Sequence, residues 1–542
     1  METRYGYDGT YTKGYDKHNI INTVNKEKNT TSSIIDIMKG GLSNLFFNNL
    51  NSQLKYEQIR LFECQVNCYT EMIKMFKIQY TVFNGSPTRS GKSITTLAVC
   101  STLGLNPFVV GPGGIKGSWD EETSKYGFTD YMFIGYDTLS GKTDNLNHKY
   151  LVKHEKKYYP TEWLRMIIKA GVMVILDECH LVKNPNSSRS NAVHAIVKCV
   201  LDMKSSSRVL IMSATPYDKP EFSQSFIKSL GIITSDKMYE YDRHNGEYLF
   251  QGYGFGQLIT MCDLIDKDNT TKILSKMKKI NKTTVGNTCH ELFINILLCK
   301  YVTYIVPDFP TKVIARNGYF NISSDAEKQI LMFEQNLIKV TGFNQETNEV
   351  SDKIDFGAVI QVLHSIERIM LEVVIRITLN KLQSNPNNRV VVYLWYRDTT
   401  NHLAHQLSMY SPGIINGTTN AVTRTKLVRN FQDPNHSSRL LIGHAESGGQ
   451  GLALDDQYGG RPLTILMMPD YRFITISQAL ARGLGMMSKS DCEAWIMFAK
   501  VQKAQRLLEI LSNKEEIVRS LVGIDSQIVT PGNLSTWIEP NM

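Results

Sequence analysis

A lysine and a hydroxyl group suited to binding a phosphate stand together at Lys92 and Ser93. A short apolar run, Tyr80 to Phe83, and a polar loop precede them, and a helical pattern follows. In that order, backbone amides and the positive helix end face the phosphates, the lysine reaches the β and γ oxygens, and the hydroxyl holds Mg²⁺. Because Ser86 stands where the strict pattern has glycine, an ordinary strand, turn and helix fits this stretch equally well. The loop residues predicted to bind nucleotide are Ser86, Pro87, Thr88, Arg89, Ser90, Gly91, Lys92 and Ser93.

Two adjacent carboxylates, Asp177 and Glu178, could supply the rest of a phosphate-cleaving site. They follow the apolar run Val172 to Leu176, about 85 residues after the loop. Asp177 is predicted to hold Mg²⁺ together with Ser93, and Glu178 to orient and deprotonate the water that attacks the γ-phosphate. In isolation, a solvated acidic pair at a strand end is the simpler interpretation. The preceding phosphate loop favours the catalytic one.

Buried strands are needed to bring these groups together. Apolar runs alternate with helical segments, which indicates a parallel sheet covered on both faces. Ligands of such sheets lie at the carboxyl ends of strands, where the loop, the acidic pair and Ser213-Ala-Thr215 all fall. The predicted strands of this first sheet include residues 80–83, 107–110, 133–136, 172–176 and 208–212. A second alternating pattern, without a phosphate loop, has predicted strands at residues 389–394, 440–443, 463–468 and 493–498.

The predicted fold class is therefore α/β, with two tandem parallel-sheet lobes and a helical insertion in or after the first lobe. Residues 141–160 are lysine-rich and unpatterned, which indicates a surface insertion. The predicted divisions are a flexible arm at 1–45, a first lobe at 46–305 with the helical insertion at about 217–300, a second lobe at 306–520 and a tail at 521–542.

Composition limits the class of protein. At 542 residues the chain is too long for one core and suits two large domains. Its net charge of +8 permits a polyanionic partner without requiring one. Nine cysteines without a paired CxxC spacing argue for reduced thiols and against a zinc site. No apolar run approaches the roughly 18 residues that span a membrane, and no secretion signal is visible. We therefore expect an intracellular protein of the cytoplasm, nucleus or virion, without a membrane partner.

Several stretches resemble, in order, the motifs of superfamily 2 helicases. Asp177-Glu-Cys-His180 is similar to the Asp-Glu-x-His box, and its continuation through Lys183-Asn-Pro resembles the Swi/Snf-like branch. Ser213-Ala-Thr215 resembles the motif that couples nucleotide binding to nucleic-acid binding. The resemblance covers about residues 54–515. Its other matches are Gln65, Pro112 with Trp119, Asn416-Gly417 with Arg424 and Phe431-Gln432, Ser447 to Leu452 as motif V, and Gln478 to Arg482 as motif VI.

The resemblance implies two recombinase-like lobes with ATP and Mg²⁺ in the cleft between them and nucleic acid across both. It implies that Gln65 contacts the adenine and that Gly451 and Gln478 face the nucleotide from the second lobe. Arg482 would give its cation to the γ-phosphate. The residues implied to couple the nucleotide state to the grip on nucleic acid are His180, Ser213 and Thr215.

Two positions depart from the family pattern. Arg89 replaces a glycine of the phosphate loop, which is tolerable only if the backbone there is not left-handed. In motif VI, Ala481 replaces a glycine and Gly485 stands where the last arginine belongs. Losing such an arginine can cost several orders of magnitude in rate. Either Arg482 or a neighbour substitutes, or hydrolysis is slow, or a partner donates the arginine. On this basis an arginine placed at position 485 is expected to raise the rate.

The leading hypothesis is an ATP-dependent translocase or helicase that acts on duplex DNA, rather than RNA, in transcription or replication. The compact build favours a viral or mobile-element enzyme with a polymerase or transcription-complex partner. The alternative is a degenerate helicase-like subunit that binds nucleotide and has a structural or regulatory role in a polymerase or capsid assembly. An unrelated phosphate-loop enzyme such as a kinase would leave the motifs of the second lobe unexplained.

Overall fold

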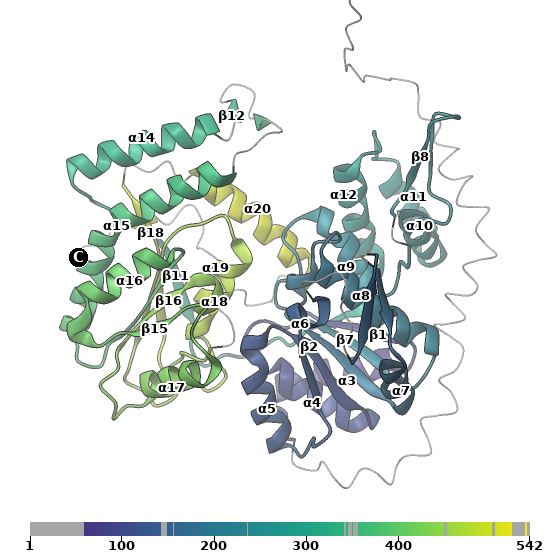
Figure 1. The fold of residues 1–542 in the computed structure, drawn as a ribbon, viewed down its shortest axis with the longest axis horizontal. Coiled ribbons are helices and arrows are strands. Elements are labelled where there is room, and N and C mark those ends of the chain that lie inside the picture. The colour runs from purple at the N-terminus through teal and green to yellow at the C-terminus, as the bar shows by residue number, and fades with distance from the viewer. Residues whose placement is uncertain are drawn as a thin grey trace, which may run out of the picture.

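The structure is a computed structural model that shows two lobes side by side (Figure 1). The predicted N-terminal arm, Gly451 and nearly all of the predicted tail lie outside the residues that it describes. Those residues are 59–141, 149–155, 157–235, 237–340, 343–344, 349–350, 356–448, 452–500, 505–522 and 537–538.

The first lobe is built on a six-stranded sheet in the order β10-β1-β7-β6-β2-β3, with every pair parallel. Side chains of β6 alternate between two cores, with Val174 and Leu176 on one face and Met173 and Ile175 on the other. Both faces are therefore buried, which explains the continuous apolar runs. The strands are β1 (Thr81–Asn84), β2 (Asn106–Gly111), β3 (Met132–Gly135), β6 (Val172–Asp177), β7 (Arg208–Met212) and β10 (Val302–Thr303).

Helices cover this sheet and an unpredicted hairpin borders it. Residues 151–160 are not an unpatterned insertion, because β4 (Leu151–His154) pairs with β5 (Lys157–Pro160). Leu151 and Tyr158 are buried in the main core, and Lys153, which lies on the same buried face of β4 as Leu151, concealed that pattern. The helices of the lobe are α3 (Glu63–Phe76), α4 (Lys92–Leu103), α5 (Lys116–Lys125), α6 (Tyr136–Ser140), α7 (Glu162–Ala170) and α8 (Ser188–Met203).

A mainly helical segment follows β7 and packs on the same lobe. The Phe226 ring lies 4.9 Å from that of Phe83 and 5.4 Å from that of Phe293, so β1 and the segment share one core. Within the described residues no helix is long and apolar enough to cross a membrane. The segment contains α9 (Ser223–Ser229), β8 (Glu240–Asp242), β9 (Glu247–Leu249), α10 (Gly254–Ile265), α11 (Lys267–Leu274), α12 (Lys282–Leu292), a π-helical turn (Phe293–Leu297) and α13 (Leu298–Tyr301).

The second lobe is built on a seven-stranded sheet in the order β15-β16-β14-β17-β18-β11-β19, also entirely parallel. The predicted fold class of two tandem parallel-sheet lobes is confirmed. The strands are β11 (Val313–Phe320), β14 (Arg389–Leu394), β15 (Gly413–Ile415), β16 (Leu440–His444), β17 (Leu463–Met467), β18 (Cys492–Ala499) and β19 (Trp537–Ile538). The helices and one small hairpin are α14 (Ser324–Val340), β12 (Phe343–Asn344), β13 (Glu349–Val350), α15 (Phe356–Ser384), α16 (Arg397–Gln406), α17 (Ala421–Gln432), α18 (Ala445–Gly448), α19 (Phe473–Leu480) and α20 (Gln505–Val522).

Helix α20 returns from the second lobe to the first (Figure 1). Lys514 Nζ lies 3.5 Å from a carboxylate oxygen of Asp218, and Ser520 Oγ lies 3.3 Å from His290 Nε2. A Cβ atom on Gly85, next to the phosphate loop, would lie 2.9 Å from Val522. The C-terminal end of α20 thus packs against the first lobe beside the phosphate loop.

His290 makes this junction sensitive to acid. Its Nδ1 lies 3.0 Å from the Tyr217 hydroxyl, and burial lowers its pKa to about 4 although the charge of Glu291 opposes this. Between pH 6.5 and 4 the unfolded chain therefore binds a proton that the native state does not. We expect the free energy of unfolding to fall by about 3 kcal/mol as the pH is lowered through this window. Urea unfolding at several pH values checks this, and a His290→Gln variant with the same acid sensitivity would contradict it.

Candidate active site between the two lobes

The phosphate loop runs from the end of β1 to the start of α4. Gly91 has a φ of 87°, and a Cβ atom on it would lie 2.2 Å from Gln65 Nε2, so this position requires glycine. Ser86 is completely buried, donates its hydroxyl to Asn84 Oδ1 and accepts a 2.8 Å hydrogen bond from the amide of Ile305. The serine that replaces the expected glycine therefore anchors the start of the loop.

Gln65, predicted to contact adenine, supports the loop here. Its Nε2 donates to Ser90 O at 2.9 Å, and its Oε1 accepts from the amide of Phe62 at 2.9 Å. Both ends of the amide are used within the protein, and only 1% of the residue is exposed. Contact with a base stays a prediction.

Lys92 begins α4 and folds back over the loop. Its Nζ donates to the carbonyl oxygens of Ser86 and Pro87, each at 3.0 Å. Burial lowers the pKa of Lys92, while the charges of Glu178 and Asp177 oppose this. A phosphate could replace the two carbonyl oxygens as the partner of this ammonium group, because both are neutral acceptors.

Asp177 is fixed by three hydrogen bonds. Its Oδ2 accepts from Trp119 Nε1 at 2.9 Å, its Oδ1 accepts from the amide of Glu178 at 2.9 Å, and its carbonyl accepts from the Tyr136 hydroxyl at 2.8 Å. Burial and the neighbouring Glu178 raise the pKa of Asp177. A cation bound beside Asp177 would therefore stabilise the ionised form of this carboxylate.

Glu178 is one of the points where the lobes meet. Its φ of 55° is left-handed, which is uncommon for glutamate and concentrates at functional sites. Its Oε2 accepts a 3.0 Å hydrogen bond from Gln478 Nε2 of α19 and lies 3.3 Å from His180 Nδ1. Burial acts to raise its pKa, but the contact with His180 and the charges of Lys92 and Arg482 outweigh it, so the pKa is lowered.

Arg482 lies on a 3₁₀ turn, Ala481–Gly483, just beyond α19. It is 3% exposed, and its Nη1 donates to Leu452 O at 3.4 Å. Burial lowers its pKa, the charge of Glu178 opposes this, and the charge of Arg89 adds to it. Cations from both lobes, Lys92 and Arg482, thus act on the Glu178 carboxylate.

The expectation that Arg89 avoids a left-handed backbone is wrong, because its φ is 68°. Its Nη2 forms a 2.9 Å ion pair with Asp455 Oδ1 of the second lobe, which offsets the strain.

The surroundings of Gly485 bear on the expected effect of an arginine at that position. A Cβ atom there would lie 2.5 Å from Asp455 Oδ2, so an arginine at 485 would displace this carboxylate. We therefore no longer expect Gly485→Arg to raise the rate.

Ser93 and Asp177 are predicted to hold Mg²⁺. They suit an ion that is bound together with the nucleotide better than an ion that the protein holds by itself. Among the residues described, no group of three or more His, Cys, Asp or Glu side chains could hold a metal. The Ser93 hydroxyl at the start of α4 and the buried Asp177 carboxylate are the donors that Mg²⁺ uses alongside phosphate oxygens. Bound there, Mg²⁺ would neutralise charge on the phosphates.

Two of the predicted coupling residues, Ser213 and Thr215, follow the end of β7, which is paired with the end of β6 at Asp177. Ser213 Oγ accepts from the amide of Thr215 at 3.1 Å, and the amide of Ser213 donates to Asn84 O at 3.4 Å. The buried Thr215 Oγ1 has no hydrogen-bond partner in the described structure. Asp218, which we did not predict, pairs with Lys183 at 2.5 Å and with Lys514 of α20 at 3.5 Å. These ion pairs link the two motif segments to the second lobe.

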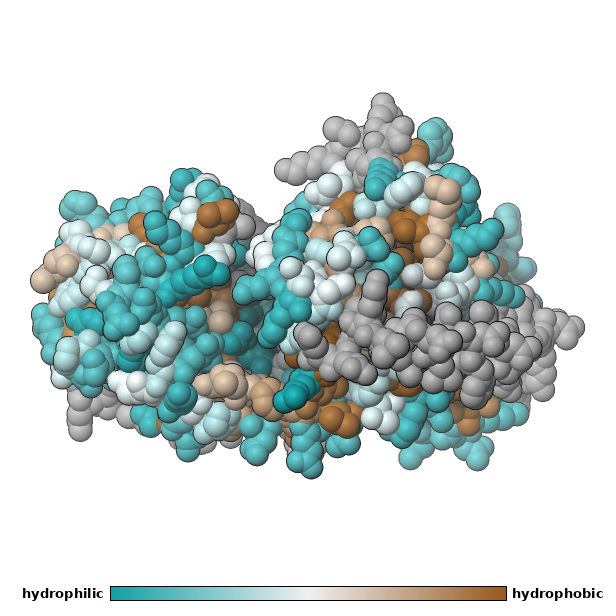
Figure 2. All heavy atoms as spheres, turned by 90° about the horizontal axis from the view of Figure 1, so that it is seen from below, coloured by the Kyte–Doolittle hydropathy of each residue, from teal (hydrophilic) through white to brown (hydrophobic). Residues whose placement is uncertain are grey.

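A cavity of about 630 Å³ is lined by both lobes. The first lobe supplies Gly113 and Gly114 after β2, and the second supplies cationic, amide and hydroxyl groups. A Cβ atom on Gly114 would lie 2.9 Å from Arg424 Nη1, so the lobes are in close contact. From below, hydrophilic side chains cover much of the second lobe and the surface is indented where the lobes meet (Figure 2). The second-lobe lining is Arg397, Asn416, Gly417, Thr418, Thr419, Arg424, His444 and Glu446.

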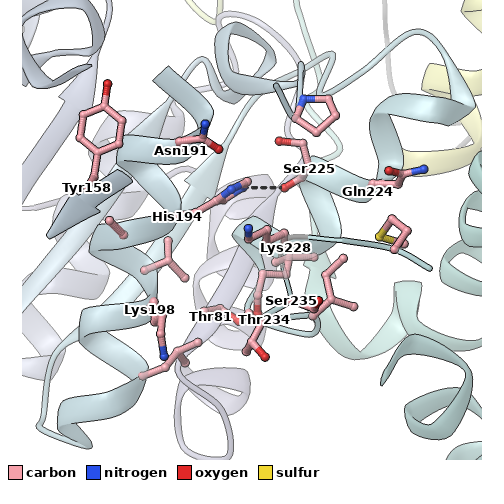
Figure 3. Close-up of a pocket in the computed structure, with 18 of the residues that line it drawn as sticks. Thr81, Tyr158, Asn191, His194, Lys198, Gln224, Ser225, Lys228, Thr234 and Ser235 are labelled. Atoms are coloured by element: carbon pink, nitrogen blue, oxygen red, sulfur yellow. Dashed lines mark hydrogen bonds between the residues drawn. The ribbon is translucent and has the colours of Figure 1, made fainter. Parts of the chain in front are cut away.

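A larger cavity of about 790 Å³ lies elsewhere in the first lobe (Figure 3). Thr81, which begins β1, lines it, whereas the phosphate loop follows the other end of that strand. The ring of His194 points at Ser225, whose carbonyl oxygen lies 3.1 Å from His194 Nε2. Because this cavity lies at the end of β1 opposite to the phosphate loop, we exclude it from the nucleotide site.

Comparisons with known proteins concern the fold. No family model and no curated protein matches the chain. The chain is similar to the Sulfolobus solfataricus SWI2/SNF2 ATPase core in complex with dsDNA, with a TM-score of 0.30 and 15% identity over 85% of this chain and 97% of that one. It is also similar to the DUF1998 helicase MrfA bound to DNA, with a TM-score of 0.41 and 10% identity over 84% of this chain and 48% of that one. The chain thus spans about half of the MrfA chain.

Proposed function

We propose that this protein hydrolyses ATP between its two lobes and uses the cycle to move along nucleic acid, as a helicase or translocase. One observation carries the proposal: the Glu178 carboxylate accepts a hydrogen bond from Gln478 of the second lobe, and the charges of Lys92 of the first lobe and Arg482 of the second both act on it. A carboxylate that stays ionised at neutral pH, with cations acting on it from both lobes, can orient a water molecule beside a polyphosphate.

Each residue then has a separate task in hydrolysis. Glu178, ionised at neutral pH, accepts the proton of the attacking water. Lys92 and Arg482 stabilise the negative charge that spreads over the γ-phosphate oxygens. Gln478 holds Glu178 Oε2 at 3.0 Å, so closure of the lobes orients the base.

The interlobe cavity beside Gly114 and Arg424 is the proposed track for the nucleic-acid backbone. Backbone phosphates are bound by arginine, hydroxyl and amide groups, and all three are present in its lining. A track made of both lobes lets a change in lobe separation move the bound strand. Following the Swi/Snf-like resemblance, we propose duplex DNA rather than RNA.

Binding to this track should weaken steeply with salt and depend little on sequence. Arg397→Ala should weaken binding uniformly across sequences and reduce the slope of log affinity against log salt by about 1, because one phosphate contact is lost. Fluorescence anisotropy with unrelated duplexes checks this. Lys276→Ala, an exposed lysine paired with Glu291 at 3.2 Å, is the control. Salt-independent binding by the parent, or binding to a single sequence, would contradict the proposal.

The second candidate function is a nucleotide-binding subunit without turnover. The crowded surroundings of Gly485, where the family pattern has an arginine, favour it. A polymerase, transcription-complex or capsid partner and a viral or mobile-element origin stay predictions from the sequence. ATP hydrolysis by the whole chain, compared with Lys92→Ala, separates the two functions, because a subunit without turnover would match the variant.

A further inference from the structure

Arg89 holds an energetically unfavourable backbone conformation for a long side chain. Its φ of 68° is left-handed, a conformation that a residue with a side chain adopts only at a cost. Such strain persists where the surroundings determine it, and it concentrates at sites of function. The side chain, rather than the backbone, must therefore account for an arginine here.

The guanidinium group is held by the second lobe along one edge. Nη2 lies 2.9 Å from Asp455 Oδ1, and Nε donates to Leu484 O at 3.4 Å. Nη1 makes no hydrogen bond to any residue that the structure describes. Because a guanidinium carries five donors in one plane, the terminal edge that includes Nη1 can still bind an oxyanion through two bonds.

Arg89, Arg482 and Lys92 carry like charges that act on one another across the two lobes. The charge of Arg89 acts on Arg482, and the charge of Arg482 acts on Lys92. Like charges gathered in a partly buried site repel one another, so the arrangement favours an anion bound among them. A triphosphate has the required charge and size.

Asp455 explains both departures in this region. It is 1% exposed, its Oδ1 holds Arg89, and its Oδ2 has no hydrogen-bond partner among the described residues. A Cβ atom on Gly485 would lie 2.5 Å from that Oδ2. The same carboxylate therefore excludes a side chain at 485 and holds a guanidinium that comes from the opposite lobe.

We propose that Arg89 contacts the nucleotide phosphates during hydrolysis and that Asp455 is its positioning residue. Resting on the proposed function, this inference adds a cation from the phosphate loop that is oriented only when the lobes are closed. Since Arg89 belongs to one lobe and Asp455 to the other, opening the cleft would release the guanidinium and slow turnover.

The test uses Arg89→Gly, because glycine relieves the left-handed backbone and keeps the loop folded. We expect kcat for ATP to fall roughly 10²–10³-fold, as on removal of one transition-state donor, with a smaller change in KM. Arg89→Lys, which keeps the charge but not the planar edge, should recover part of the rate. Asp455→Asn should lower kcat, and the Arg89→Gly/Asp455→Asn double variant should be no slower than Arg89→Gly, because Asp455 acts through Arg89.

Controls separate this inference from the proposed function. Lys198→Ala and Asp202→Asn disrupt an exposed ion pair of 3.0 Å on α8 and should leave kcat unchanged. If the parent hydrolyses ATP and Lys92→Ala does not, an Arg89→Gly variant with parental or higher kcat overturns this inference alone. Such a result would make the Arg89–Asp455 pair a structural link or a brake. A parent that never exceeds Lys92→Ala overturns both proposals.

Discussion

Replacing Arg482 by glutamine should abolish nucleic-acid-stimulated ATP hydrolysis, lowering the rate by roughly 10³–10⁵-fold, while ATP binding is retained. The transition state spreads charge over the γ-phosphate oxygens, and Mg²⁺ with Lys92 covers only one side of it. Arg482 comes from the second lobe, where it is 3% exposed and the charge of Glu178 acts on it, so we expect it to supply the cation on the other side. Glutamine retains a hydrogen-bond donor of similar shape without the cation.

Phosphate release with saturating ATP and duplex DNA, alongside binding of a fluorescent nucleotide, measures this prediction. Arg439→Gln is a matched control, because Arg439 donates to Leu382 O at 3.0 Å on a different part of the lobe. If Arg482→Gln kept the stimulated rate, the catalytic cation of the second lobe would have to come from another residue or from a partner.

Glu178→Gln should slow hydrolysis by roughly 10²–10⁴-fold with ATP affinity nearly unchanged, because a general base is lost while the shape of the side chain is kept. The amide can still accept from Gln478 Nε2, so the contact of 3.0 Å between the lobes can persist. The loss should therefore appear in kcat rather than in KM.

Lys92→Ala is the comparison for Glu178→Gln, because it should lose nucleotide affinity instead. Single-turnover hydrolysis and equilibrium binding distinguish the two defects. A Glu178→Gln variant that hydrolyses ATP at the parental rate would show that another group activates the water, and the assignment of the base would be wrong.

The sheets were predictable where strands are buried on both faces. The runs at 208–212 and 389–394 match β7 and β14 residue for residue, since in each a continuous apolar run follows an arginine. Strand β11 was missed because Arg316 and Asn317 interrupt its apolar pattern. The short β15 was missed for want of length, and the β4–β5 hairpin because Lys153 conceals its alternation.

The site was predictable where the strand ends fix it. Lys92, Asp177 and Glu178 follow strands of one parallel sheet, so their proximity follows from topology. The contact between Arg89 and Asp455 joins residues 366 positions apart across two lobes. No local pattern signals such a contact, and only the unusual arginine in the loop hinted at it.

The role of Gln65 in supporting the phosphate loop could not be predicted for a similar reason. Its amide is bound at both ends, to Ser90 O and to the Phe62 amide, and these contacts depend on how α3 packs beside the loop. Trp119 was matched to a motif, but its 2.9 Å hydrogen bond to Asp177 becomes visible only in the folded chain.

The rate of ATP hydrolysis by the whole chain, measured with no nucleic acid, single-stranded DNA, duplex DNA and RNA, tests the central claim most directly. We predict Mg²⁺-dependent hydrolysis that rises most with duplex DNA and is lost in Lys92→Ala. A parent whose rate equals that of Lys92→Ala under all four conditions would contradict the assignment of this cleft as an ATP-hydrolysing site.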